Sequence, residues 1–155
     1  METVDITGDG QYILAIDNYR QALIYFSNNS VYELFQIITL SNDTSEVSHG
    51  GAITDDHQWM VASIGNEIQV FTFDSNNSEF SLHQTIGNLS STVMHISLTN
   101  DHLFMAVTTN SDFVSIFKYD GSEFYESQKL GFASINGERA FLSDDHQHLI
   151  TCQDA

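Results

Sequence analysis

The chain has 155 residues, of which 21 are Asp or Glu and only four are Lys or Arg, so its formal net charge is −17. This charge disfavours binding to nucleic-acid phosphates and to anionic membrane surfaces, and it would attract a protein partner with a basic surface. With 41% hydrophobic and 12% aromatic residues, the chain has enough apolar side chains for a folded core. Its high net charge therefore does not indicate a disordered protein. No signal peptide and no apolar run of about 18–20 residues is visible. The sequence therefore predicts a folded protein without membrane insertion, located in the cytoplasm.

Short β-type runs separated by polar turns follow one another along the chain. The first three groups contain four runs each and cover residues 4–38, 52–86 and 94–130. A fourth group begins at Arg139 and stops after two runs, near residue 153. The second group is the clearest: its runs are GAIT, WMVASI, IQVFTFD and FSLHQTI, and its turns are DDHQ, GNE and SNNSE. No stretch keeps an apolar period of 3.6 over three turns, so no helix is predicted.

Three landmarks recur at corresponding places in these groups. The turn Thr54–His57 returns at 99–102 and 143–146, with a looser copy at 7–10. An apolar run with a small fourth residue follows each turn: Tyr12–Ala15, Trp59–Ala62, Leu103–Ala106 and His148–Thr151. An aromatic residue precedes a glutamine by four positions in the pairs Tyr32/Gln36, Phe80/Gln84 and Phe124/Gln128. The landmarks agree on a period near 44–48 residues, which is typical of four-stranded propeller blades.

The sequence thus predicts an all-β chain, a β-propeller of four-stranded antiparallel blades. The second run of each blade is apolar on both faces and suits an inner strand, whereas the fourth is polar and suits an exposed edge. About three and a half blades are present in a single domain spanning residues 1–155. Because closed propellers have at least about four blades, we expect this chain to be part of a longer propeller, or to be completed by blades from copies or another chain.

Two of the runs resemble known repeats. Ile68–Phe73 and Val114–Tyr119 resemble the third strand of the WD40 repeat, with Phe71 and Phe117 at the position of its Trp. Thr72 and Lys118 replace the Asp that follows this Trp, and the Gly-His pair of WD40 repeats is missing. The units TDDHQWMVAS and LSDDHQHLIT resemble the turn and strand shared by WD40, YVTN-type and lactonase-type propellers, and VTTNSDFVSIFKYDGSEF is similar to the blades of the lactonase-like family. The resemblance covers nearly the whole chain and implies a propeller, with the subfamily open.

No catalytic, metal or cofactor site can be assigned from the residue pattern. His57, His102 and His146 take the same turn position in successive blades, about one blade apart, which is too far for one zinc ion. The neighbouring Asp56, Asp101 and Asp145 are expected to bond their own turns. The loop Asp74–Glu79 matches a calcium loop poorly, and Cys152 is expected to be a small core residue.

Exposed turns between the second and third strands are the predicted binding face, because they gather at one end of the central channel. The candidate partner-binding residues there are Asp17, Tyr19, Arg20, Asn66, Glu67 and Asp112. Because no catalytic motif is visible, the sequence favours a non-catalytic protein-interaction scaffold built on a WD40-like β-propeller. The alternative is a lactonase-like or ligand-binding propeller enzyme with its site in the channel, and an extracellular propeller with calcium-binding loops is a third hypothesis.

Overall fold

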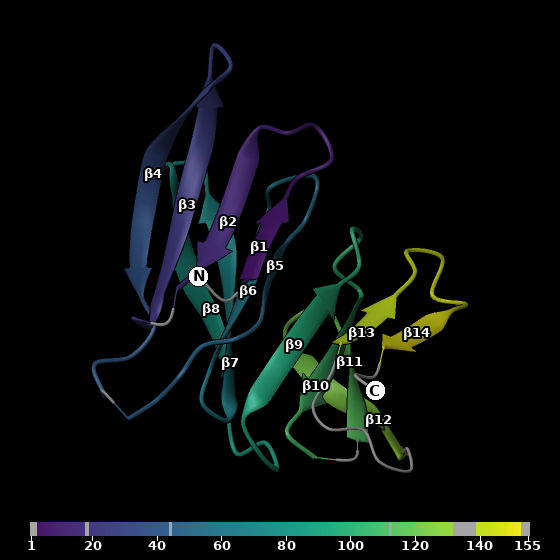
Figure 1. Cartoon of the computed structure of the whole chain (residues 1–155). Coiled ribbons are helices and arrows are strands. Elements are labelled where there is room, and N and C mark those ends of the chain that lie inside the picture. Colours follow the sequence, from purple (N-terminus) through teal and green to yellow (C-terminus); the bar gives the residue numbers. More distant parts are fainter. Residues whose placement is uncertain (1–2, 18, 44, 112, 132–138, 153–155) are drawn as a thin grey trace.

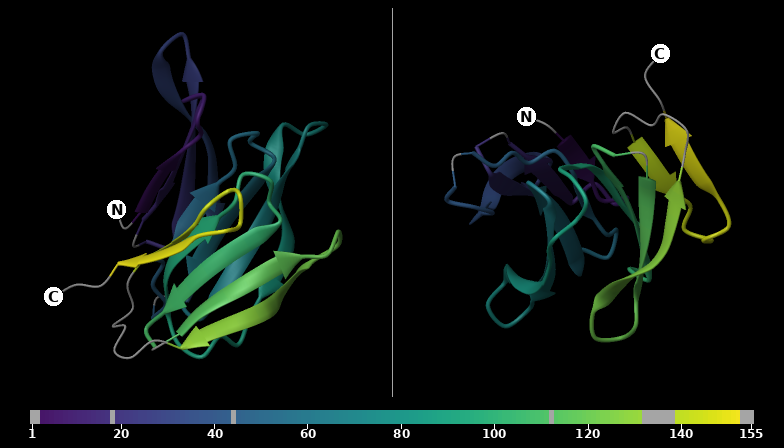
Figure 2. Two further views of the ribbon diagram at one scale, coloured as in Figure 1. Left: turned by 90° about the vertical axis from the view of Figure 1, so that its right-hand side faces the viewer. Right: turned by 90° about the horizontal axis from the view of Figure 1, so that it is seen from below.

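The structure, a computed structural model, describes residues 3–152 except 18, 44, 112 and 132–138. The described residues form β-strands, turns and loops, with no helix among them, as predicted. The strands are grouped in three four-stranded antiparallel sheets and one two-stranded sheet (Figure 1). In Figure 2 the sheets follow one another around an arc in the order of the sequence. The predicted all-β architecture of antiparallel blades is confirmed.

Each sheet is built from strands that are consecutive in the chain. Blade 1 contains β1 (Thr3–Ile6), β2 (Tyr12–Ile16), β3 (Gln21–Asn28) and β4 (Val31–Thr39). Blade 2 contains β5 (Gly51–Ile53), β6 (Trp59–Ile64), β7 (Glu67–Asp74) and β8 (Glu79–Ile86). Blade 3 contains β9 (Val93–Leu98), β10 (Phe104–Thr109), β11 (Phe113–Tyr119) and β12 (Phe124–Gly131). The half blade contains β13 (Arg139–Leu142) and β14 (Leu149–Cys152), and residue 153 of the predicted range lies outside the described residues.

The position of a strand within its blade decides its burial. The first strands β1, β5, β9 and β13 lie nearest one another, at the inside of the arc. All six residues of β6 are buried, because this strand has a neighbouring blade on each face. The fourth strands β4, β8 and β12 are mostly exposed, and their polar residues protect an open sheet edge.

The hydrophobic core lies between blades rather than within one. Leu14 and Ile24 of blade 1 pack with Met60 and Phe71 of blade 2. The opposite face of blade 2 packs on blade 3, where the only tryptophan of the chain, Trp59, is 9% exposed. A smaller cluster joins blade 3 to the half blade. Strand alternation therefore gives blades 2 and 3 two apolar faces, one for each neighbouring blade.

Two sequence-based expectations need correction. The Thr99 hydroxyl donates to the carbonyl of Phe104, as the Thr54 hydroxyl donates to that of Trp59. The residue of blade 3 that is equivalent to Trp59 is therefore Phe104 and not Leu103. The fourth residue of the second strand of blade 3 is then Val107, and a small residue is not required at this position. Cys152 is exposed and not a core residue, because β14 is the last described strand of its sheet and has no neighbour on its outer face.

Candidate functional site: the hollow along the inner strands

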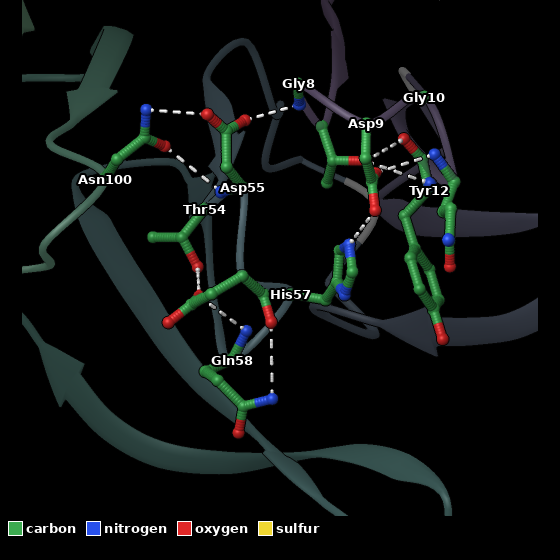
Figure 3. Close-up of polar contacts among 12 residues, drawn as sticks. Gly8, Asp9, Gly10, Tyr12, Thr54, Asp55, His57, Gln58 and Asn100 are labelled. Atoms are coloured by element: carbon green, nitrogen blue, oxygen red, sulfur yellow. Dashed lines mark hydrogen bonds and ion pairs between the residues drawn. The ribbon is translucent and has the colours of Figure 1, made fainter.

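The turns after the first strands are tied together across the blades (Figure 3). Asp55 accepts hydrogen bonds from the backbone N–H of Gly8 and from the side-chain amide of Asn100, the latter at 2.8 Å. Asn100 in turn donates from its backbone N–H and its amide to Asp144, at 2.9 and 3.0 Å. Gly8, Asp55, Asn100 and Asp144 hold the second position of four successive turns. This chain of contacts fixes one end of the hollow that runs along the inner strands.

Inside each turn an aspartate closes the backbone. Asp56 accepts the N–H of Gln58 at 2.9 Å and the Thr54 hydroxyl, and Asp101 and Asp145 do the same in their own turns. The predicted role of these three aspartates is thus confirmed.

The turn histidines connect neighbouring blades. His57, His102 and His146 have φ values of 58°, 53° and 59°, a left-handed conformation that sends each ring toward the preceding blade. His57 Nε2 lies 3.0 Å from Asp9, and His146 Nε2 lies 2.9 Å from Asp101. His102 stacks on Trp59 with ring centroids 4.8 Å apart. The side chains of these three histidines therefore link each blade to the preceding one.

A hollow of about 360 Å³ lies along the inner strands. It is lined by residues of β1, β5, β9 and β13 and by the tied turns, and its polar side chains include Asp5, His95, Ser97, Arg139 and Asp144. This volume is in the range of small-molecule sites, which are about 300–1,000 Å³. Arg139 is the one cation among the four Lys and Arg residues of the chain that lines the hollow.

His95 is the most perturbed titratable group of the hollow. Burial, and then the positive charge of Arg139, lower its pKa from 6.5 to about 4, against a backbone hydrogen bond with Ala140. Its ring meets the edge of Phe141 at 4.8 Å between centroids. The side chain is therefore a neutral imidazole near pH 7, and its Nδ1 is a buried polar atom without a hydrogen-bond partner among the described residues.

Asp5 connects the first two inner strands. Its carboxylate accepts the N–H of Ile53 at 2.9 Å and that of Ile6 at 3.0 Å. Burial raises the pKa of Asp5, and these two hydrogen bonds oppose the shift. At the corresponding place of blade 3, the hydroxyl of Ser97 accepts the N–H of Leu142 at 3.3 Å. Polar side chains at this position hold adjacent inner strands in register.

The predicted partner-binding residues lie apart from this hollow, in the turns between second and third strands. Asp17 accepts the N–H groups of Tyr19 and Gln21, both at 2.9 Å, and so shapes its own turn. Asn66 donates to the carbonyl of Leu89 at 3.4 Å. Of the remaining candidates, Glu67 and Arg20 are half-buried, Tyr19 is 73% exposed, and Asp112 lies outside the described residues. Whether these residues bind a partner stays a prediction.

Sequence reasoning missed the residues of the hollow. It concentrated on the fourth position of the repeated turn, whereas the second position lines the hollow. Thr3, His95 and Arg139 take the same repeat position in their inner strands, three residues before Ile6, Leu98 and Leu142 respectively. An alignment of the inner strands would have placed His95 and Arg139 at the same repeat position, and this is the signal in the sequence that could have identified them.

Among the described residues, no group of three or more His, Cys, Asp or Glu side chains could hold a metal ion. The described part of the chain also has no helix long and apolar enough to cross a membrane.

Solved structures share this fold at low sequence identity, whereas no protein-family model and no curated protein sequence matches the chain. A protein from Lactobacillus plantarum has a TM-score of 0.68 and 17% identity over 82% of this chain and 40% of its own. Two structures are described as "putative 6-phosphogluconolactonase". The one from Bacteroides fragilis has a TM-score of 0.67 and 13% identity over 83% of this chain and 38% of its own. The one from Bacteroides uniformis has a TM-score of 0.74 and 12% identity over 96% of this chain and 46% of its own.

The chain spans less than half the length of each of these structures. None of the three is described as a WD40 protein, so the comparisons support the wider propeller resemblance and not the WD40 repeat in particular. Together with the four sheets around the hollow, they show that the chain folds as part of a β-propeller.

Proposed function

We propose that this chain contributes the inner-strand hollow to a ligand-binding propeller of the lactonase type, with a small, uncharged, hydroxyl-rich lactone as the ligand. The observation that supports it best is the convergence of His95, Arg139, Asp5 and Asp144 on one hollow of about 360 Å³. The description of two similar structures as lactonases points in the same direction.

The charges of the hollow favour an uncharged ligand. Asp5, Asp55 and Asp144 face it together with the single cation Arg139, so an added phosphate would meet a net negative field. A sugar lactone instead offers hydroxyl groups to the carboxylates and a carbonyl oxygen to the guanidinium.

The proposed reaction is hydrolysis of the ring ester. Arg139 stabilises the negative charge that develops on the carbonyl oxygen when water attacks the carbonyl carbon. The ring C–O bond then breaks, and the product is a hydroxy acid that has gained one water molecule. His95, with its low pKa, accepts a hydrogen bond from the attacking water and orients it, while the proton is released to solvent.

The test is titration of the 155-residue chain with glucono-δ-lactone and, separately, with its 6-phosphate. Binding is monitored by the NMR signals of the histidine rings, and hydrolysis is monitored by proton release. We expect the uncharged lactone to shift the His95 signals and to bind more tightly than the phosphate. His95→Gln and Arg139→Gln should each weaken binding about 2- to 12-fold, the range of one hydrogen bond, whereas the matched variant His83→Gln, whose ring bonds Ser122 outside the hollow, should not. An unchanged His95 signal at saturating lactone would refute the site.

A protein-interaction function is the second candidate. It is favoured by Tyr19, a residue that is 73% exposed in a turn, since exposed tyrosines are frequent anchors of protein interfaces.

A further inference from the structure

Glutamine side chains connect neighbouring blades. Gln36 of β4 donates its amide to the carbonyl of Phe80 at 2.9 Å and accepts the N–H of Phe80 at 2.8 Å. Gln84 of β8 makes the same pair with Phe124, at 2.8 and 2.7 Å. At both places a side-chain carboxamide supplies the donor and the acceptor that a backbone group of the next blade requires.

A third glutamine bonds to the segment that crosses between blades. Gln69 of β7 donates its amide to the carbonyl of Leu40 at 2.9 Å. Leu40 lies in the crossing from blade 1 to blade 2, and its N–H donates to the carbonyl of Arg20, the residue before β3, at 2.8 Å. The carboxamide of Gln69 therefore joins β7 to this crossing.

Blade 3 has a serine where blade 2 has this glutamine. Gln69 pairs with Ala62, and Ser115 pairs with Val107; both partners are the fourth residue of the second strand of their blade. Serine is shorter than glutamine, and the buried Ser115 hydroxyl donates to the carboxylate of Glu126 in β12 at 2.6 Å instead of to a crossing. The tie between the third strand and the crossing is thus not repeated in blade 3.

The crossing from blade 2 to blade 3 otherwise follows the preceding one. Leu89 takes the place of Leu40, since its N–H donates to the carbonyl of Asn66, the residue before β7, at 3.1 Å. The carbonyl of Leu89 accepts the Asn66 side-chain amide at 3.4 Å, a longer hydrogen bond than the 2.9 Å bond from Gln69 to Leu40. The Leu89 carbonyl therefore receives a weaker donor than the Leu40 carbonyl does.

A polar hollow of about 160 Å³ lies between Ser115 and this crossing. Its lining includes Leu89, Ser115, Glu126 and Lys129. Lys129 of β12 pairs with Ser115, and its ammonium group lies 4.7 Å from the ring centroid of Phe113. The hollow thus combines a carboxylate and a backbone carbonyl, which accept hydrogen bonds, with an ammonium group, which donates them.

We propose that this hollow binds a primary carboxamide, in the place that the side chain of Gln69 takes in blade 2. The NH₂ group of the ligand donates to the Leu89 carbonyl and to the Glu126 carboxylate, and its oxygen accepts from Lys129. Lys129 would repel a lone cation and Glu126 a lone anion, whereas a carboxamide is neutral and has both a donor and an acceptor. A small free amide and the end of a glutamine or asparagine side chain both carry this group. The inference is independent of lactone binding.

The test is titration of the 155-residue chain with acetamide and, separately, with N-acetylglutamine methylamide, followed by the backbone NMR signals of Leu89 and Ser115. We expect saturable shifts of both signals, with a Kd for acetamide on the order of 1–100 mM because the ligand is so small. Tighter binding of the glutamine derivative would assign the site to a side chain of a partner protein, and tighter binding of acetamide would assign it to a free amide.

Ser115→Gln is the sharpest variant, because blade 2 carries a glutamine at this position. It should fill the hollow and weaken acetamide binding by at least about 10-fold. Ser81→Gln changes an exposed serine of β8 outside the hollow and is the matched control, which should bind like the unaltered chain. Lys129→Met removes one donor at an exposed position and should weaken binding about 2- to 12-fold, the range of one hydrogen bond.

The proposal is overturned if acetamide at molar concentration causes no saturable shift of Leu89 and Ser115, or if Ser115→Gln and Ser81→Gln bind it equally well. Binding of methylammonium or acetate as tight as that of acetamide would equally overturn it, because a single charge and not the carboxamide would then be recognised.

Discussion

The glutamine contacts between blades can be tested most sharply at Gln84. Replacing it with alanine removes both hydrogen bonds to Phe124, which are 2.8 and 2.7 Å long. Each such bond contributes about 0.5–1.5 kcal/mol to stability, and here the backbone groups of a 3% exposed residue would lose a partner. We therefore expect Gln84→Ala to lower the free energy of unfolding by about 2–3 kcal/mol, or Tm by about 4–12 °C for a chain of this size.

Urea unfolding followed by Trp59 fluorescence is the suitable assay, because this ring packs in the same interface, 6.2 Å from the ring of Phe124. Gln84→Met keeps the length of the side chain without its amide and should lose nearly as much stability as alanine. Gln128→Ala should change the free energy by less than about 0.5 kcal/mol, since its side chain is exposed. Wild-type stability of Gln84→Met, or an equal loss in Gln128→Ala, would show that these hydrogen bonds do not hold the blades together.

Three further predictions follow from burial and exposure. Because the pKa of His95 is about 4 in the folded chain and 6.5 in the unfolded chain, the unfolded chain binds a proton first as the pH falls. The free energy of unfolding of the wild type should therefore fall by up to about 3 kcal/mol between pH 6.5 and 4. Urea unfolding at several pH values checks this, and an equal change of this free energy with pH in the wild type and in His95→Gln would contradict it. A Cβ at Gly51 would lie 2.8 Å from the Ile16 side chain, so Gly51→Ala should lower the free energy of unfolding by about 1–3 kcal/mol. In a double-mutant cycle, Ile16→Ala should remove this clash and give at least about 1 kcal/mol of favourable coupling. Simple additivity of the two changes would disprove the clash. Tyr19→Ala should leave Tm within about 2 °C of wild type while reducing recovery of a protein partner in a pull-down; undiminished recovery would remove this turn as a docking surface.

The repeat made the fold predictable from the sequence, because each blade obeys the same local rules. The apolar run Trp59–Ile64, the turn chemistry of Asp56 and the polar fourth strands all have counterparts in other blades. The role of Gln84 could not be predicted, although its spacing from Phe80 was visible, because a bulge decides which face it occupies and no residue pattern marked that bulge.

The candidate site was harder to predict than the fold. Its residues come from four inner strands, and their meeting depends on how the blades turn around the arc. The pKa of His95 in particular results from burial and from Arg139, 44 positions later in the sequence. The turns proposed from the sequence were recognisable by composition alone, which is why they were favoured over the hollow.

The glutamine contact also bears on how such a protein can change over time. The side-chain amides of Gln36 and Gln84 bond to backbone N–H and C=O groups of the next blade, which every residue except proline supplies in full. Side chains of that blade can therefore be replaced without loss of these hydrogen bonds. Blades joined in this way can keep their arrangement while their amino-acid sequence changes widely.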